Sequence, residues 1–145
     1  MSLDASPLTI GALAERTDCN VPTIRYYEEI GLLAKAGRRP GGHRFYREAD
    51  VKRLTFIRRC REFQFPLEKV RELVDLIDHP ERDCNAAKQL AEEHLVVVRK
   101  KLVELQALEQ SLSLFAESCS SLCAGGPARD CVILEDLGSP TSSCC

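Results

Sequence analysis

Apolar positions in the first part of the chain recur at helical spacing in two short segments separated by turn residues. In the first segment, three apolar residues share one helical face: Ile10, Leu13 and Ala14. Thr9 precedes them and suits an N-cap, because its hydroxyl can accept a backbone N–H. The residues TDCN at 17–20 favour a turn, and a second helix follows with Pro22 in its first turn and Gly31 at its end. This spacing predicts a helix-turn-helix.

The next residues, KAGRRPGGHRFY at 35–46, change from helical to strand-like character. Gly and Pro occupy their centre, and HRFY has the aromatic content of a strand. Two further amphipathic helical patterns follow, at 47–63 and 66–77. A basic hairpin directly after a helix-turn-helix is the arrangement of a winged DNA-binding domain, which we place at residues 1–78.

A long uninterrupted helical pattern follows a polar linker at 79–84. Residues 85–118 contain no Gly or Pro, and apolar residues recur in steps of three and four, at positions 91, 95, 98, 102, 105, 108, 112 and 115. Steps of this kind over this length predict a coiled-coil seam. Because an isolated helix would leave this stripe in water, we expect a homodimer held together by this dimerisation helix.

Charge is distributed unevenly along the chain, although its net value is only −2. Residues 1–62 carry 12 Lys/Arg against 8 Asp/Glu, whereas residues 63–145 carry 8 against 14. Between residues 35 and 61 there are ten basic residues and two acidic ones. A basic block of this kind indicates a polyanionic partner such as nucleic acid, with an ordinary solvated surface as the alternative.

Other features of the sequence indicate where the protein is located and what chemistry its cysteines perform. The sequence has neither a secretory signal nor the roughly 20-residue apolar run that spans a membrane, so we expect a cytoplasmic protein without a membrane partner. It also lacks a phosphate-cradling glycine loop and a Ser/His/Asp arrangement, so we expect no enzyme. Eight cysteines in a reducing compartment favour metal ligands or redox thiols over structural disulfides.

Four segments, in their order and spacing, closely resemble the MerR family of bacterial transcription regulators: LTIGALAERT, TIRYYEEIGLL, GGHRFY and DVKRLTFIRRCREF. The resemblance covers nearly the whole chain. It implies a mainly α fold, in which a dimer carries a winged helix-turn-helix at each end of an antiparallel coiled coil. It also implies double-stranded promoter DNA and RNA polymerase as partners, with an effector that activates the promoter by bending and untwisting the DNA.

The resemblance further implies which residues contact DNA. The expected set comprises Thr23, Arg25 and Tyr26 on the recognition helix and Arg38, Arg39, Arg44 and Tyr46 in the wing. A guanidinium fork suits base edges and phosphates alike, so Arg25 is the favoured contact on the helix. The wing arginines are expected to meet phosphates, with Tyr46 either packing or donating its hydroxyl. Tyr27 and Phe45 are assigned to the core.

By the same resemblance, residues 119–138 form the effector site, a metal-binding loop closed by a short helix. Cys119 and Cys131 match two loop ligands, and Cys84 matches the third ligand of divalent-ion sensors. Copper(I) and gold(I) sensors typically have serine at that third position. A helix over 85–118 is roughly 51 Å long, so Cys84 and Cys119 of one chain cannot share an ion. An antiparallel dimer instead brings Cys84 beside Cys119 and Cys131 of the partner chain.

Three thiolates suit a soft or borderline divalent ion. The sequence looks most like cadmium- and lead-responsive members, with zinc- and mercury-responsive members next. Cys123 is an additional thiol that either completes a tetrahedral site or stays spare. Cys144 and Cys145 end a Gly/Ser/Pro/Thr tail at 139–145, which either captures metal or is passive.

Two other functions fit the same scaffold. A thiol redox switch would oxidise two of the loop cysteines to a disulfide, across the flexible Gly-Gly-Pro segment at 125–127. Such a switch would make no use of Cys84. A monovalent-metal sensor would likewise bind its ion in the loop alone. We expect Cys19 and Cys60 to be small packed residues in all three cases.

Overall fold

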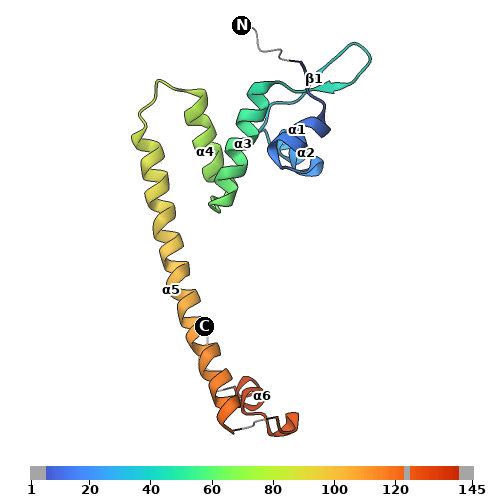
Figure 1. The fold of residues 1–145 in the computed structure, drawn as a ribbon. Coiled ribbons are helices and arrows are strands. Elements are labelled where there is room, and N and C mark those ends of the chain that lie inside the picture. The colour runs from blue at the N-terminus through green and yellow to red at the C-terminus, as the bar shows by residue number, and fades with distance from the viewer. Residues whose placement is uncertain (1–5, 123–124, 141–145) are drawn as a thin grey trace. The chain divides into compact units, whose positions relative to one another are not determined.

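The computed structural model describes residues 6–122 and 125–140, except for the side chains of residues 119–122. Figure 1 shows a mainly helical chain, whose elements in order are α1 (Ile10–Thr17), α2 (Val21–Glu29), β1 (Gly37–Arg38), β2 (Arg44–Phe45), α3 (Glu48–Glu62), α4 (Leu67–Asp78), α5 (Asn85–Leu122), the 3-10 helix η1 (Ala128–Asp130) and α6 (Val132–Leu137). The chain divides into two compact units, residues 1–91 and 92–145. The predicted fold class is confirmed.

Helices α1 and α2 form the predicted helix-turn-helix, and polar caps define where each begins. Thr9 Oγ1 accepts the Ala12 N–H at 3.2 Å, as the sequence predicts. Asn20 Oδ1 accepts the Thr23 N–H at 2.8 Å and so caps α2. Gly31 follows the end of α2 with a φ of +77°, a conformation that stops the helix and that glycine adopts without strain.

Strands β1 and β2 form the predicted wing, an antiparallel hairpin in which Arg38 pairs with Arg44. Gly37 pairs with Phe45, and a Cβ at Gly37 would lie 2.4 Å from the Phe45 ring. Only glycine therefore lets the ring lie across the first strand. The Arg47 guanidinium also lies over this ring, 5.6 Å from its centroid, in a cation–π contact. These contacts agree with a packing role for Phe45.

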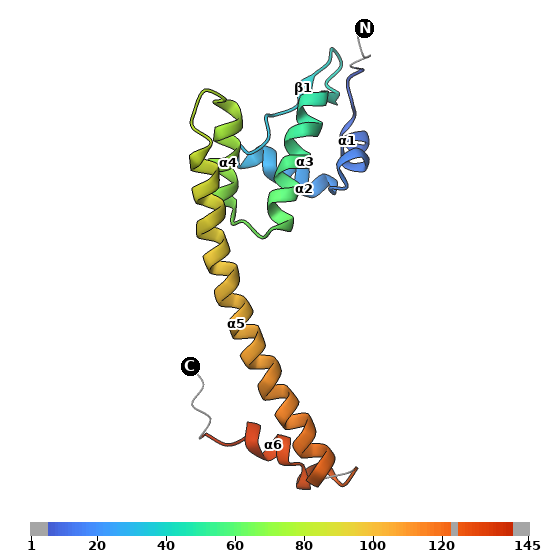
Figure 2. The same ribbon diagram turned by 60° about the vertical axis from the view of Figure 1, so that its left-hand side comes forward.

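The core of the first unit lies between α1, α2, α3 and α4. Its fully buried side chains include Leu13, Ile24, Leu54, Ile57 and Val70. Helix α3 packs against both α1 and α4, and Figure 2 shows α3 and α4 side by side. The spacing of these residues is the helical period that the sequence shows, so the amphipathic pattern places the core correctly.

Arginine side chains connect α4 to the elements that it covers. Arg53 of α3 forms a bidentate ion pair with Asp78 at the end of α4. Arg71 of α4 donates to the carbonyl of Ile30, the C-cap residue that follows α2. The recognition helix is thereby attached at its C-terminal end to α4, and α4 leads directly into the linker before α5.

Helix α5 has 38 residues and continues to Leu122, four residues beyond the predicted end at 118. Cys119 therefore belongs to the last turn of the helix, whereas the sequence analysis placed it at the start of the loop. The physical reason is that the sequence supplies no helix-breaking residue before Gly125, which has a φ of +87°, and Pro127. Ser and Cys at 118–121 are tolerated in a helix.

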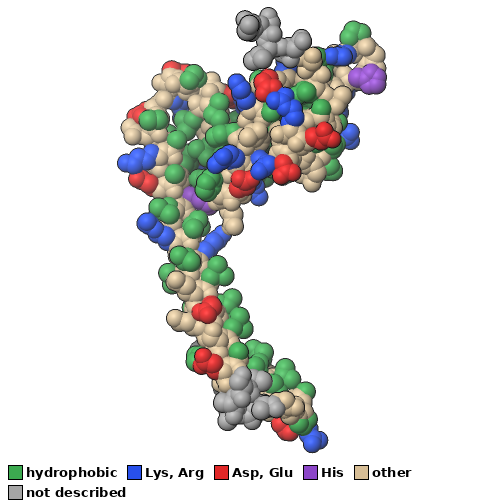
Figure 3. All heavy atoms as spheres, viewed as in Figure 1, with side chains coloured by type: hydrophobic (Ala, Val, Ile, Leu, Met, Phe, Trp, Pro, Cys, Tyr) green, Lys and Arg blue, Asp and Glu red, His purple; other side chains and the backbone are tan. Residues whose placement is uncertain are grey.

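Large apolar side chains of the second unit are exposed along α5, and Figure 3 shows them in green on the visible face of the helix. Those at predicted seam positions are Leu95, Val98, Leu102, Leu105, Leu108 and Leu112, each at least 43% exposed. Others lie off the seam, among them Val96, Val103 and Leu114. No helix in the described residues is long and apolar enough to cross a membrane.

The end of the described chain is built from η1 and α6. Pro127 precedes η1, and the Cys131 N–H closes it by donating to the Ala128 carbonyl at 3.1 Å. The Cys131 carbonyl then accepts the Glu135 N–H at 3.1 Å, which begins α6. Cys131 is thus fixed by its backbone at the junction of two short helices, and α6 lies where the family resemblance implies a helix that closes the loop.

Candidate functional site

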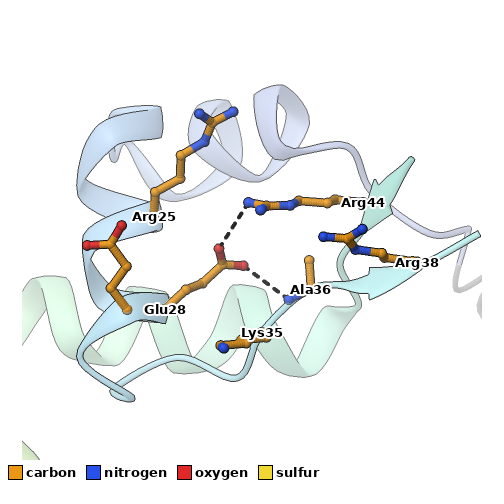
Figure 4. Close-up of a pocket in the computed structure, with 7 residues that line it drawn as sticks. Arg25, Glu28, Lys35, Ala36, Arg38 and Arg44 are labelled. Atoms are coloured by element: carbon orange, nitrogen blue, oxygen red, sulfur yellow. Dashed lines mark hydrogen bonds and ion pairs between the residues drawn. The ribbon is translucent and has the colours of Figure 1, made fainter. Parts of the chain in front are cut away.

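Four cationic side chains gather where the recognition helix α2 meets the β1–β2 wing (Figure 4). The pocket between them has a volume of about 580 Å³ and is lined by Arg25, Glu28, Glu29, Lys35, Ala36, Arg38 and Arg44. Arg25, Arg38 and Arg44 belong to the predicted DNA-contacting set. A concave surface with an excess of cations attracts phosphate groups, so the pocket is a candidate subsite for the DNA backbone.

The other predicted DNA-contacting residues do not line this pocket. Thr23 is half-buried in the first turn of α2, next to the Asn20 cap. Tyr26 is 46% exposed, and its ring lies 6.0 Å from that of the buried Tyr27. Arg39 is exposed near the tip of the wing, where its N–H donates to the His43 carbonyl.

Glu28 is a charged residue in the pocket that sequence reasoning missed, and it is only 8% exposed. Its Oε1 accepts the Tyr46 hydroxyl at 2.9 Å and the Ala36 N–H at 3.1 Å. Its Oε2 lies 3.6 Å from Arg44 Nη1. One signal was available in the sequence: Glu28 lies three residues after Arg25 in α2, so the two share a helix face.

The structure corrects the DNA-contact prediction for Tyr46. Its side chain is fully buried and therefore has no surface to offer to a duplex. Of the two roles considered, packing is the one observed, and the hydroxyl donates to Glu28 inside the protein. Burial, together with the nearby carboxylate, raises the pKa of Tyr46 to about 12. Its backbone also pairs with Leu8 through two hydrogen bonds of 2.8 Å.

Cys84 is an exposed free thiol immediately before the first residue of α5. It lies at the edge of a second pocket, of about 290 Å³, which is lined by Phe56, Leu73, Leu76, Ile77, Pro80, Arg82, Asp83, Cys84 and Ala87. Asp83 accepts the Asn85 N–H at 2.9 Å, and this hydrogen bond lowers the pKa of the Asp83 carboxyl. Cys84 is thereby held between the linker and the start of the helix.

The linker before Cys84 is folded onto the end of α4. Asp75 forms an ion pair with Arg82, and its carboxylate lies 3.2 Å from Nδ1 of His79. The hydrogen bond between the His79 ring and the Asp75 carbonyl, at 2.8 Å, raises the pKa of His79. These contacts fix the path of the chain toward the predicted metal ligand.

The other predicted metal ligands lie at the far end of the chain. Cys131 is a half-buried free thiol. The side chain of Cys119, and all of Cys123, Cys144 and Cys145, lie outside the described residues. Within the described part of a single chain, no three His, Cys, Asp or Glu side chains are grouped so that they could hold a metal ion.

Cys60 and Cys19 have the packed environments that the sequence analysis expects. Cys60 is buried in the core of the first unit, and Cys19 is half-buried against that core. Burial raises the pKa of both thiols. Both are thus poor thiolate ligands.

Family models match the chain over most of its length. The model described as MerR HTH family regulatory protein matches residues 8–77, and the one described as MerR, DNA binding matches residues 51–114. Together they cover residues 8–114, which include α1–α4 and most of α5.

Similar proteins are known in several bacteria. The HTH-type transcriptional regulator ZntR of Escherichia coli (strain K12) is 36% identical over 88% of this chain and 90% of its own length. A probable heavy metal-dependent transcriptional regulator of Haemophilus influenzae is 33% identical over 90% of this chain and 98% of its own. The chain is 40% identical in sequence to PbrR691 from Ralstonia metallidurans CH34. It matches the crystal structure of PbrR691 in complex with lead(II) with a TM-score of 0.76. That match covers 90% of this chain and 98% of PbrR691.

Proposed function

The chain belongs to the MerR family of DNA-binding transcriptional regulators, which are not enzymes. We propose that it senses a soft divalent metal ion through thiolates shared between two copies of the chain. The observation that carries the proposal is the placement of Cys84. It is an exposed free thiol fixed at the start of α5, whereas Cys119 lies in the last turn of the same helix. Both ends of the dimerisation helix therefore carry a cysteine.

Dimerisation is supported by the exposed seam of α5. Six large apolar side chains at seam spacing would remain in water in a single chain, at a cost of about 25 cal/mol per Å² of apolar surface. Pairing with a second copy in antiparallel orientation covers this stripe. It also brings the first residues of one α5 beside the last residues of the other, which places Cys84 of one chain near Cys119 and Cys131 of its partner.

The donor set fits a soft ion. Thiolates at Cys84, Cys119 and Cys131 favour cadmium, lead, zinc or mercury over calcium or magnesium, which prefer oxygen ligands. Cys123 is a further donor available in the same segment, and Cys144 and Cys145 are available in the tail. We propose cadmium or lead as effector, with zinc or mercury next. The lead-bound structure of PbrR691 and the similarity to the probable heavy metal-dependent transcriptional regulator of Haemophilus influenzae support a metal of this class.

A metal site shared in this way would link the position of its cysteine ligands to the position of the DNA-binding units. Cys84 follows a linker that Asp75 and Arg82 hold against α4, and Arg71 of α4 contacts the end of recognition helix α2. Movement of Cys84 toward thiolates of the partner chain therefore acts on the element that enters the DNA. With two recognition helices so linked, the protein can change the bend and twist of a promoter and activate transcription by RNA polymerase.

In vitro transcription tests this proposal. The operator is first selected from genomic fragments by binding to the purified protein, and transcription from it is then measured with each metal ion. Addition of cadmium or lead should raise transcription by RNA polymerase, and Cys84→Ser should abolish the response. If an oxidant raises transcription and no metal does, the chain is a redox sensor. A response to copper(I) that ignores Cys84 would make it a monovalent-metal sensor.

A further inference from the structure

We propose that Glu28 is a positioning residue for DNA binding, which holds the wing against recognition helix α2 and keeps Arg44 oriented toward a backbone phosphate. The proposal rests on the phosphate contact that the sequence analysis expects of Arg44. Glu28 itself is nearly buried and lines the cationic pocket, so its effect on DNA is exerted through Arg44.

The two oxygens of the Glu28 carboxylate have different partners. Oε1 accepts from the Ala36 backbone, just before β1, and from the Tyr46 hydroxyl, just after β2. It therefore fixes both ends of the hairpin to α2. Oε2 faces the Arg44 guanidinium at 3.6 Å, and Figure 4 shows Arg44 directed along the pocket toward this carboxylate. Arg44 still exposes 45% of its side chain, which leaves surface for a phosphate.

A charged residue at this position has two opposite effects on DNA affinity. A carboxylate near phosphate groups repels them, so its removal alone would strengthen binding. Holding Arg44 in one orientation reduces the conformational entropy lost on binding, so removal of the anchor would weaken binding. The sign of the change in affinity therefore distinguishes a positioning residue from an incidental acidic group.

Glu28→Gln is the informative variant, because it keeps the size of the side chain. The amide oxygen can take the place of Oε1 and accept from Ala36 and Tyr46. The amide NH₂ then replaces Oε2 and faces Arg44, donor against donor. Glu29→Gln is the matched control, since Glu29 is the next residue of α2, lines the same pocket and is exposed.

The experiment measures the affinity of the full chain for a random-sequence duplex over a series of salt concentrations. Glu28→Gln should weaken binding about three- to tenfold and lower the slope of log K against log salt by about one phosphate contact. Glu29→Gln should leave binding unchanged or strengthen it. In an Arg44→Ala background, Glu28→Gln should no longer weaken binding, because the two act as one unit.

Stronger binding by Glu28→Gln, or full additivity with Arg44→Ala, would overturn the proposal. If Arg44→Ala alone leaves affinity unchanged, the phosphate contact is wrong and the positioning role fails with it, whereas the metal-sensing proposal is untouched. Should Glu28→Gln fail to fold, Tyr46→Phe replaces it. This variant removes one donor to Glu28 from a residue that cannot touch DNA, so weaker binding supports the proposal and unchanged binding contradicts it.

Discussion

The two units of this protein differ in whether their apolar side chains are buried or exposed. In the described residues, all thirteen buried hydrophobic side chains lie in the first unit, residues 1–91. Of fifteen large hydrophobic side chains that are exposed, twelve lie in the second unit. The first unit thus closes a core of its own, whereas the second presents an exposed apolar surface of the kind that marks an interaction site.

This difference separates two functions along the chain. A closed core and the hydrogen bonds of Glu28 hold the DNA-reading surface without help from a partner. The dimerisation helix depends on association, because a long amphipathic helix gains most of its stability from packing. The proposed effector site, placed where two copies would meet, would therefore act on the arrangement of two DNA-binding units that each have a core of their own.

The largest expected effect comes from a charge placed in the seam. Leu102→Glu should weaken dimerisation about a hundredfold or more, because an unpaired carboxylate would be buried between the helices. Val103→Glu is the matched control, since it lies on another face of α5 and is also exposed. Analytical ultracentrifugation measures both. Equal loss of dimer in the two variants would mean that the interface is not the predicted seam.

A smaller effect is expected on the DNA-binding side. Arg44→Ala should weaken binding to operator and random duplex alike, by about three- to tenfold, and should flatten the salt dependence by about one phosphate contact. Fluorescence anisotropy at several salt concentrations measures it, with Arg99→Ala on α5 as the control. A loss confined to the operator would instead assign Arg44 to a base contact.

A third expected effect concerns pH and the first unit alone. The pKa of Tyr46 rises on folding from 10.0 to about 12, so its contribution to stability is complete below pH 10 and is lost as the pH rises through 12. Between these values, the free energy of unfolding should fall more steeply in the wild type than in Tyr46→Phe. Denaturant unfolding across this range measures the difference, and parallel curves would contradict the buried Tyr46–Glu28 contact.

Much of the first unit could be predicted from the sequence, because each of its elements has a local signal. Thr9 and Gly31 mark helix ends, and the apolar period places Leu13, Leu54 and Ile57 in the core. The role of Tyr46 could not be decided in this way. A tyrosine in a basic wing suits a phosphate contact as well as packing, and only its neighbour Glu28, 18 residues earlier, decides between them.

In the second unit, the sequence predicted the long helix better than the residue at which that helix ends. Spacing alone predicts the long helix and its apolar stripe, whereas the helix at Val132–Leu137 was expected from the family resemblance. The end of α5 was placed four residues early, because Ser and Cys carry weak signals for or against a helix. The proposed metal ligands rest on a family resemblance and on the positions of cysteines at the ends of α5, since a site formed between two chains would leave no trace in the contacts of one chain.

The central claim is that a metal ion binds thiolates from two copies of the chain. An anaerobic titration of the reduced protein with cadmium, lead, zinc and mercury tests it most directly, with binding monitored by thiolate-to-metal charge-transfer absorption. Wild type and Cys84→Ser are compared, with Cys19→Ser as a control for the loss of one thiol. Saturation near one ion per chain, lost or strongly weakened only in Cys84→Ser, is the predicted result. Binding that is the same in all three proteins would contradict a site shared across the dimer.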